Sequence, residues 1–118
     1  MQRTYDHKES ITAEAERLCV WLGPGWEPRV WNNMGWCFEA HYKGLIHVNP
    51  CSREGTWFCM IGECGMVASL APERLIKTPD PRQVVQLTVA AYKEKWLAMR
   101  AKQEQLIAAG EECLKGVL

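Results

Sequence analysis

The sequence predicts an α+β domain with an N-terminal helix, an antiparallel meander of three or four strands, and a long C-terminal helix packed on one face of the sheet. Apolar residues recur at helical spacing near both ends of the chain, whereas residues 29–70 form short alternating runs separated by glycine- and proline-containing turns. The length of 118 residues and the apolar fraction of 47% fit one folded domain over residues 1–118.

The first predicted helix covers residues 10–22 and follows a flexible tail at residues 1–9. Ser10 can act as the N-cap, because its side-chain oxygen can accept a hydrogen bond from the first turn. Gly23 and Pro24 end the helix, since glycine commonly follows the last helical residue and proline cannot continue it. The apolar stripe of this helix consists of Ile11, Ala15, Leu18 and Leu22.

Four of the six tryptophans recur every five residues, a spacing that matches neither a helix nor a strand. The series must therefore cross several elements. We expect a loop over residues 23–28, a short edge strand over residues 29–31 and a turn at Asn32-Asn33. The four residues are Trp21, Trp26, Trp31 and Trp36.

The next segment reads as a hairpin whose register follows from its alternation. A three-residue loop at residues 42–44 pairs Phe38 with Val48 and keeps one face apolar, whereas a two-residue loop would mix polar and apolar residues on both faces. The opposite face carries Glu39 across from His47, and we expect it to be solvated. A third strand over residues 56–61 and a fourth over residues 66–70 complete the meander.

The C-terminal helix is predicted over residues 81–109, with Gly110 as its end and residues 111–118 as a tail. Asp80 supplies a cap and Pro81 occupies the first helical position, where proline is favoured. Its apolar stripe contains Val85, Val89, Tyr92, Trp96, Met99 and Leu106.

This helix is longer than the sheet it covers, because it would extend about 43 Å whereas strands of six residues span about 20 Å. Three explanations are open. The helix kinks near residues 102–104, its second half packs on the N-terminal helix, or it contacts another chain, as in a homodimer through the C-terminal helix.

Charge and hydropathy disfavour two classes of partner. The 14 basic and 14 acidic residues balance, whereas domains that bind nucleic acid mainly through phosphates usually carry a basic excess. A small nucleic-acid-binding module remains an alternative, with Phe58 and Met60 as the sizeable apolar residues of the outer sheet face. No basic-then-apolar leader begins the chain and no apolar run approaches about 20 residues, so we expect a cytoplasmic protein without a membrane partner.

The six cysteines are expected to be buried thiols of a reducing compartment. Cys59 and Cys64 form one loose pair, with Cys51 as a further conceivable ligand, whereas structural zinc sites usually present two tight pairs. We therefore expect no metal and no cofactor. A zinc-stabilised structural module is the alternative that these three residues leave open.

The sequence shows no arrangement typical of a catalytic site. The three histidines are expected to be solvated, and His41 with Cys37 or Cys51 could pair a base with a nucleophile, but no nucleophile elbow or oxyanion loop accompanies them. We therefore expect a non-enzymatic protein. The three histidines are His7, His41 and His47.

The tryptophans divide into core and interface candidates. Trp36 and Trp57 belong to the predicted apolar sheet face and Trp96 to the helix above it, whereas Trp26 and Trp31 lie in a segment rich in proline, glycine and asparagine. Exposed aromatic residues in such segments are typical anchors of protein interfaces. The predicted partner-binding residues are Trp26, Arg29, Trp31, Asn33, Tyr42 and Lys43.

The run at residues 23–40, Gly-Pro-Gly-Trp-Glu-Pro-Arg-Val-Trp-Asn-Asn-Met-Gly-Trp-Cys-Phe-Glu-Ala, resembles small uncharacterised accessory proteins of bacteriophages and prophages. Phage accessory proteins include inhibitors of host defence such as anti-CRISPR proteins, so the resemblance implies that the protein binds and inhibits a host protein or defence complex in the bacterial cytoplasm. Many anti-CRISPR proteins that mimic DNA are strongly acidic, and this neutral chain departs from that pattern. We therefore expect shape and aromatic contacts to dominate over charge mimicry.

Overall fold

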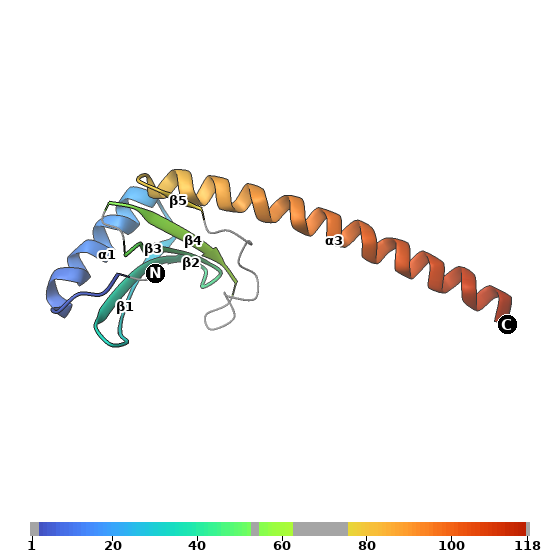
Figure 1. The fold of residues 1–118 in the computed structure, drawn as a ribbon, viewed down its shortest axis with the longest axis horizontal. Coiled ribbons are helices and arrows are strands. Elements are labelled where there is room, and N and C mark those ends of the chain that lie inside the picture. Colours follow the sequence, from blue (N-terminus) through green and yellow to red (C-terminus); the bar gives the residue numbers. More distant parts are fainter. Residues whose placement is uncertain (1–2, 53–54, 63–75, 118) are drawn as a thin grey trace.

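The computed structural model describes residues 3–52, 55–62 and 76–117, and it confirms the predicted α+β architecture (Figure 1). An N-terminal helix is followed by an antiparallel sheet and a long C-terminal helix that packs on it. The elements are α1 (Lys8–Leu22), β1 (Trp26–Asn32), β2 (Trp36–Tyr42), β3 (Ile46–Pro50), β4 (Trp57–Ile61), β5 (Lys77–Thr78) and α3 (Pro81–Val117).

The five described strands are hydrogen-bonded in chain order, β1-β2-β3-β4-β5, and every neighbouring pair is antiparallel. Helix α1 packs on β1 and β2, and the start of α3 packs on β4 and β5. Both helices cover the same face, because residues of α1, three strands and α3 form one buried cluster, which we call the helix-covered face. The buried members are Ile11, Ala15, Leu18, Cys19, Phe38, Ala40, Val48, Cys59 and Val84.

Helix α1 begins two residues earlier than predicted, and Ser10 is not its cap. His7 occupies the N-cap position, and the Ser10 hydroxyl donates to the His7 carbonyl at 3.1 Å, so this hydroxyl bonds backward instead of accepting from the first turn. The predicted end is confirmed, since the Gly23 amide donates to the Cys19 carbonyl. Tyr5, which belongs to the predicted flexible tail at residues 1–9, is instead attached to β2. Tyr5 and Trp36 exchange two backbone hydrogen bonds of 2.8 Å.

Strand β1 is longer than the predicted strand at residues 29–31. Trp26, which was expected in a loop, is its first residue and lies directly opposite Tyr42 of β2. Pro28 lies within this strand without breaking it, because proline lacks a backbone donor and an edge strand needs no such donor on its outer side.

The β2–β3 hairpin has a different register from the predicted one, and the predicted pairing of Phe38 with Val48 is wrong. Val48 lies opposite Ala40, since the three-residue loop falls one residue later, over residues 43–45, with a turn centred on Lys43 and Gly44. Both turn residues have positive φ, 54° and 68°, and the Leu45 amide donates to the Tyr42 carbonyl. The pairing shifts by two residues, so the predicted apolar face is retained.

Strand β4 agrees with the predicted third strand to within one residue. The predicted fourth strand at residues 66–70 lies outside the described residues. The short strand β5 pairs with β4, with Thr78 opposite Trp57.

Helix α3 begins as predicted, because the Asp80 carboxylate accepts a hydrogen bond from the Arg82 amide at 2.9 Å. Its predicted end at Gly110 is wrong, since the helix continues without interruption to Val117. A helical glycine costs about 1 kcal/mol relative to alanine, which strong helix formers on both sides can offset. The residues past 110 are therefore helical and not a tail.

The unbroken helix removes two of the three explanations for its length. Residues 102–104 remain helical, so no break occurs there, and the second half does not pack on α1. All described residues from Lys93 onward are exposed, and α3 projects far beyond the sheet in Figure 1. The described chain is accordingly elongated, with extents of 67 × 26 × 25 Å.

Candidate functional site

The six predicted partner-binding residues do not form one surface. Trp26 and Trp31 belong to the same strand and are separated by an odd number of positions, so their side chains point to opposite faces of the sheet. Trp26 shares the helix-covered face with Tyr42, whereas Trp31 and Arg29 lie on the other face, which we call the outer face.

Trp26 and Tyr42 form a structural pair. Their ring centroids are 5.6 Å apart, and Trp26 packs against the buried core cluster. Gly25 approaches the same tyrosine so closely that an added Cβ would lie 2.6 Å from its ring. Lys43 adds a cation to this pair, with its Nζ 5.6 Å from the centroid of the Tyr42 ring. This group attaches the start of β1 to the domain.

Arg29 and Trp31 form a second pair on the outer face of β1. The Arg29 guanidinium carbon lies 5.0 Å from the centroid of the Trp31 ring, within the range of a cation–π interaction. The Arg29 side chain is 42% exposed, and Trp31 is half-buried. Both side chains are therefore accessible and already arranged against each other.

A buried carboxylate fixes the position of Arg29. Glu39 lies directly opposite Arg29 in the β1–β2 register, and Arg29 Nη1 donates to its Oε1 at 3.1 Å. The Glu39 side chain is only 5% exposed. A buried charge must be paired and hydrogen-bonded to be tolerated, so this contact constrains both residues.

His47 holds the other oxygen of Glu39. Its Nδ1 lies 2.9 Å from Glu39 Oε2, and its Nε2 lies 2.9 Å from the Gly62 carbonyl oxygen. Both ring nitrogens face acceptors, an arrangement that only the doubly protonated imidazole satisfies in full. The hydrogen bond to Glu39 raises the pKa of His47, and it outweighs burial, which lowers that pKa.

The prediction that Glu39 and His47 lie on a solvated face is wrong. Both are buried, as are Cys37, Asn49 and Phe58 on the same outer face. Strand alternation places these residues on one face but does not show whether that face is covered. A positional signal did exist, since Arg29 lies opposite Glu39 once β1 is extended to Asn32.

Burial also changes the candidate residues of the nucleic-acid alternative. Phe58 is buried and Met60 is half-buried, so Phe58 offers no open ring on which a base could stack. His41, expected to be solvated, is half-buried, and its Nδ1 accepts a hydrogen bond from the Gly44 amide at 3.2 Å. His7 is exposed.

The turn between β1 and β2 extends the Arg29–Trp31 surface. Asn33 is exposed and its amide donates to the Gly35 carbonyl at 2.9 Å. Met34 has a positive φ of 56° and is 97% exposed, which is unusual for a large apolar side chain. We call the set of Arg29, Trp31, Asn33 and Met34 the β1 surface.

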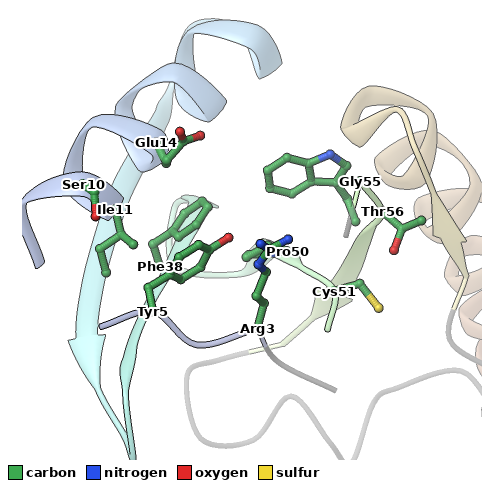
Figure 2. A pocket seen from close by; sticks show the side chains of 11 residues that line it. Arg3, Tyr5, Ser10, Ile11, Glu14, Phe38, Pro50, Cys51, Gly55 and Thr56 are labelled. Atoms are coloured by element: carbon green, nitrogen blue, oxygen red, sulfur yellow. The ribbon is translucent and has the colours of Figure 1, made fainter. Parts of the chain in front are cut away.

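A separate pocket of about 380 Å³ lies between the N-terminal segment, α1 and the β3–β4 connection. Figure 2 shows the rings of Tyr5 and Phe38 side by side in its wall, and their centroids are 5.6 Å apart. Arg3 lies 5.1 Å from the Tyr5 centroid, and Glu14 adds a carboxylate to the lining. The described lining includes the Cys51 thiol but no histidine that could act as its base.

Two of the three cysteines considered as zinc ligands lie in the described part of the chain. Cys51 and Cys59 are buried, Cys64 lies outside the described residues, and no group of three potential ligand side chains is present among residues 3–52, 55–62 and 76–117. Burial raises the pKa of the Cys59 thiol to about 12.

The exposed part of α3 continues the stripe that packs on the sheet. Val84, Thr88 and Tyr92 are buried, and the residues that follow at the same helical spacing are exposed. Trp96 was expected in the core but is 43% exposed, with its ring 5.4 Å from that of Tyr92. Trp36 and Trp57, in contrast, pack against the core cluster as predicted.

Comparisons of the chain with protein-family models, with curated proteins and with solved structures found no match. Among the described residues, no helix has both the length and the apolarity needed to cross a bilayer. The basis for assigning a function is therefore the chemistry of the surfaces described above.

Proposed function

We propose that this chain is a non-enzymatic accessory protein that binds another protein through the β1 surface. The observation that supports this function is the Arg29–Trp31 pair, which is held in place from below by the buried Glu39 and His47. Tryptophan and arginine are the residues most enriched among those that dominate the energy of protein interfaces.

The buried support favours binding over a purely structural role. A flexible arginine loses side-chain entropy when a partner immobilises it, about 0.5–1.5 kcal/mol for each such side chain. Arg29 already donates to Glu39 and stacks on Trp31, so much of this entropy is lost on folding and not on binding. The pair therefore presents a preorganised aromatic and cationic contact.

The neighbouring residues suit a protein partner. Met34 supplies an adaptable apolar side chain, and Asn33 supplies hydrogen-bonding groups at the rim of the surface. Trp26, Tyr42 and Lys43 are not part of the proposed contact, because they lie on the other side of the sheet or at its opposite end. The assignment thus keeps three of the six predicted residues, Arg29, Trp31 and Asn33.

The kind of partner is inferred from the sequence resemblance. The similarity of residues 23–40 to phage accessory proteins suggests a host protein, such as a defence complex, whose activity this chain inhibits. The balanced charge of 14 basic and 14 acidic residues supports contact through shape and aromatic groups instead of mimicry of nucleic acid.

The test compares host proteins captured from nuclease-treated bacterial lysate by immobilised wild type, Trp31→Ala and Trp21→Ala. Trp21 is a matched control, since it is also an exposed tryptophan but lies on α1. We expect wild type and Trp21→Ala to retain the same host protein. Trp31→Ala should bind that protein about 30-fold more weakly or worse, which corresponds to the loss of an interface anchor that contributes about 2 kcal/mol. Equal binding of that protein by all three would refute the role of the β1 surface.

A further inference from the structure

The projecting part of α3 exposes apolar side chains along its whole length. Residues 93–117 extend about 38 Å beyond the last buried position of the helix. Exposed apolar residues recur along this segment, and Leu106 is 64% exposed. In proteins a helix gains most of its stability from packing an amphipathic face, and residues 93–117 are exposed in the part of the chain that the structure describes. These side chains are Trp96, Met99, Leu106, Ile107, Leu114 and Val117.

The spacing of the stripe is that of a coiled-coil core. Starting from the buried Tyr92, positions separated alternately by four and three residues continue to the end of the helix. They span more than three heptads, the length at which such a pattern becomes informative. The core positions beyond Tyr92 are Trp96, Met99, Gln103, Leu106, Gly110, Cys113 and Val117.

The sizes of these core residues select one orientation of two identical helices. The bulky Trp96 and Met99 lie in the first half, whereas the small Gly110 and Cys113 lie in the second half. Antiparallel pairing sets Trp96 against Cys113 of the second copy, and Met99 against Gly110. Parallel pairing would set tryptophan against tryptophan and glycine against glycine, which crowds one end and leaves a cavity at the other.

The charges favour the same orientation. Residues 93–102 contain four basic side chains and one acidic side chain, whereas residues 103–117 contain three acidic side chains and one basic side chain. Antiparallel pairing brings each basic half beside the acidic half of the second copy. Parallel pairing would place Lys95 beside Arg100 of the second copy, at flanking positions where like charges repel.

We propose that two copies of this chain associate through residues 93–117 of α3 in an antiparallel coiled coil. The two domains then lie at opposite ends, and the tip of each helix reaches Tyr92 of the second copy. This contact is distinct from the β1 surface, so it goes beyond the function proposed above.

The first experiment measures the mass of the full-length protein in solution by sedimentation equilibrium. We expect a dissociation constant of about 1 µM or lower, so wild type at about 100 µM should be almost entirely dimeric. Leu106→Asp buries two aspartates in the contact and is expected to weaken the dimer about 100-fold or more. Ala108→Asp adds the same charge on the opposite side of the helix and should preserve the dimer.

Loss of the dimer can be distinguished from misfolding of the domain and from an effect on the β1 surface. Both residues are exposed and lie beyond the part of α3 that packs on the sheet, so the domain should stay folded in both variants, with the buried Cys59 protected from iodoacetamide. Trp31→Ala should remain dimeric. A wild-type protein that stays monomeric would overturn the proposal, and this is also the result expected if the stripe binds a different protein. Equal weakening of the dimer by Leu106→Asp and Ala108→Asp would overturn it as well.

The second experiment tests orientation by disulfide cross-linking in a Cys113→Ser background. In the antiparallel pair, residue 99 of one copy lies about 16 Å along the axis from residue 99 of the second copy, which is too far for a disulfide. It lies beside residue 110 of the second copy. Met99→Cys alone and Gly110→Cys alone should therefore not cross-link, whereas an equimolar mixture should give the mixed disulfide, identified by mass spectrometry. Self-cross-linking of Met99→Cys alone would overturn the antiparallel assignment.

Discussion

His47 Nδ1 lies 2.9 Å from Glu39 Oε2, and both side chains are only 5% exposed. This buried pair sits beneath Arg29, whose guanidinium bonds to the other carboxylate oxygen and stacks on Trp31. A charge network of this kind links the stability of the domain to the geometry of its proposed binding surface.

His47 should make stability depend on pH above the ordinary histidine range. Its folded-state pKa is raised above the unfolded value of about 6.5, so its contribution is fully present below pH 6.5 and is lost as pH rises through the folded pKa. We expect the free energy of unfolding, measured with urea between pH 6 and 9, to fall with pH more steeply in wild type than in His47→Gln. Identical slopes for wild type and His47→Gln would refute the prediction.

Glu39→Gln should destabilise the domain by about 2 to 4 kcal/mol, because it removes the anionic partner of a buried histidine and of Arg29. Urea denaturation of the purified variants measures this loss. Glu27→Gln changes an exposed glutamate of β1 on the same outer face and should cost about 0 to 1 kcal/mol. A similar small change for both variants would show that the buried network contributes little.

Gly25→Ala should cost more stability than Gly44→Ala. Both glycines have positive φ, 90° and 68°, so either alanine introduces backbone strain of about 1 kcal/mol. A Cβ at Gly25 would also lie 2.6 Å from the Tyr42 ring, whereas at Gly44 it would meet open space. Thermal unfolding of the two variants under one condition provides the comparison, and equal melting temperatures would contradict the crowding at Tyr42.

Cys59 should resist alkylation in the folded protein. Its pKa of about 12 leaves almost no thiolate at pH 8, and the side chain is fully buried. Peptide mass spectrometry after iodoacetamide treatment should find Cys59 unmodified in native protein and modified in 6 M guanidinium, a concentration chosen at roughly the level that unfolds even very stable domains. Rapid labelling of native protein would mean that β4 opens readily.

The elements set by local chemistry could be predicted from the sequence. Asp80 and Pro81 define the start of α3 through contacts within one turn, and Gly23 ends α1 in the same way. The hairpin register was wrong by two residues, yet its faces were right, because alternation determines sides but not pairing. The prediction that α3 ends at Gly110 was wrong because glycine is tolerated inside a helix as well as after its last residue.

Only part of the candidate site could be predicted from the sequence. Arg29 and Trp31 stood out by residue type and by their segment, and their role in binding stays a prediction. The burial of Glu39 and His47 was not predicted, because it depends on what covers the outer face, a property of tertiary structure that a period of two does not encode. The division between Trp26 and Trp31 follows from their odd separation once β1 is known to begin at Trp26.

The two faces of β1 imply two different evolutionary pressures on one short strand. Trp26 and Val30 pack against the core, so most replacements there should lower the amount of folded protein. Trp31 lies on the outer face, so its replacement should spare the amount of folded protein and weaken the proposed binding. A library of every single substitution at residues 26, 30 and 31, sorted once for expression and once for binding to the captured host protein, would therefore separate Trp31 from the two core-facing positions.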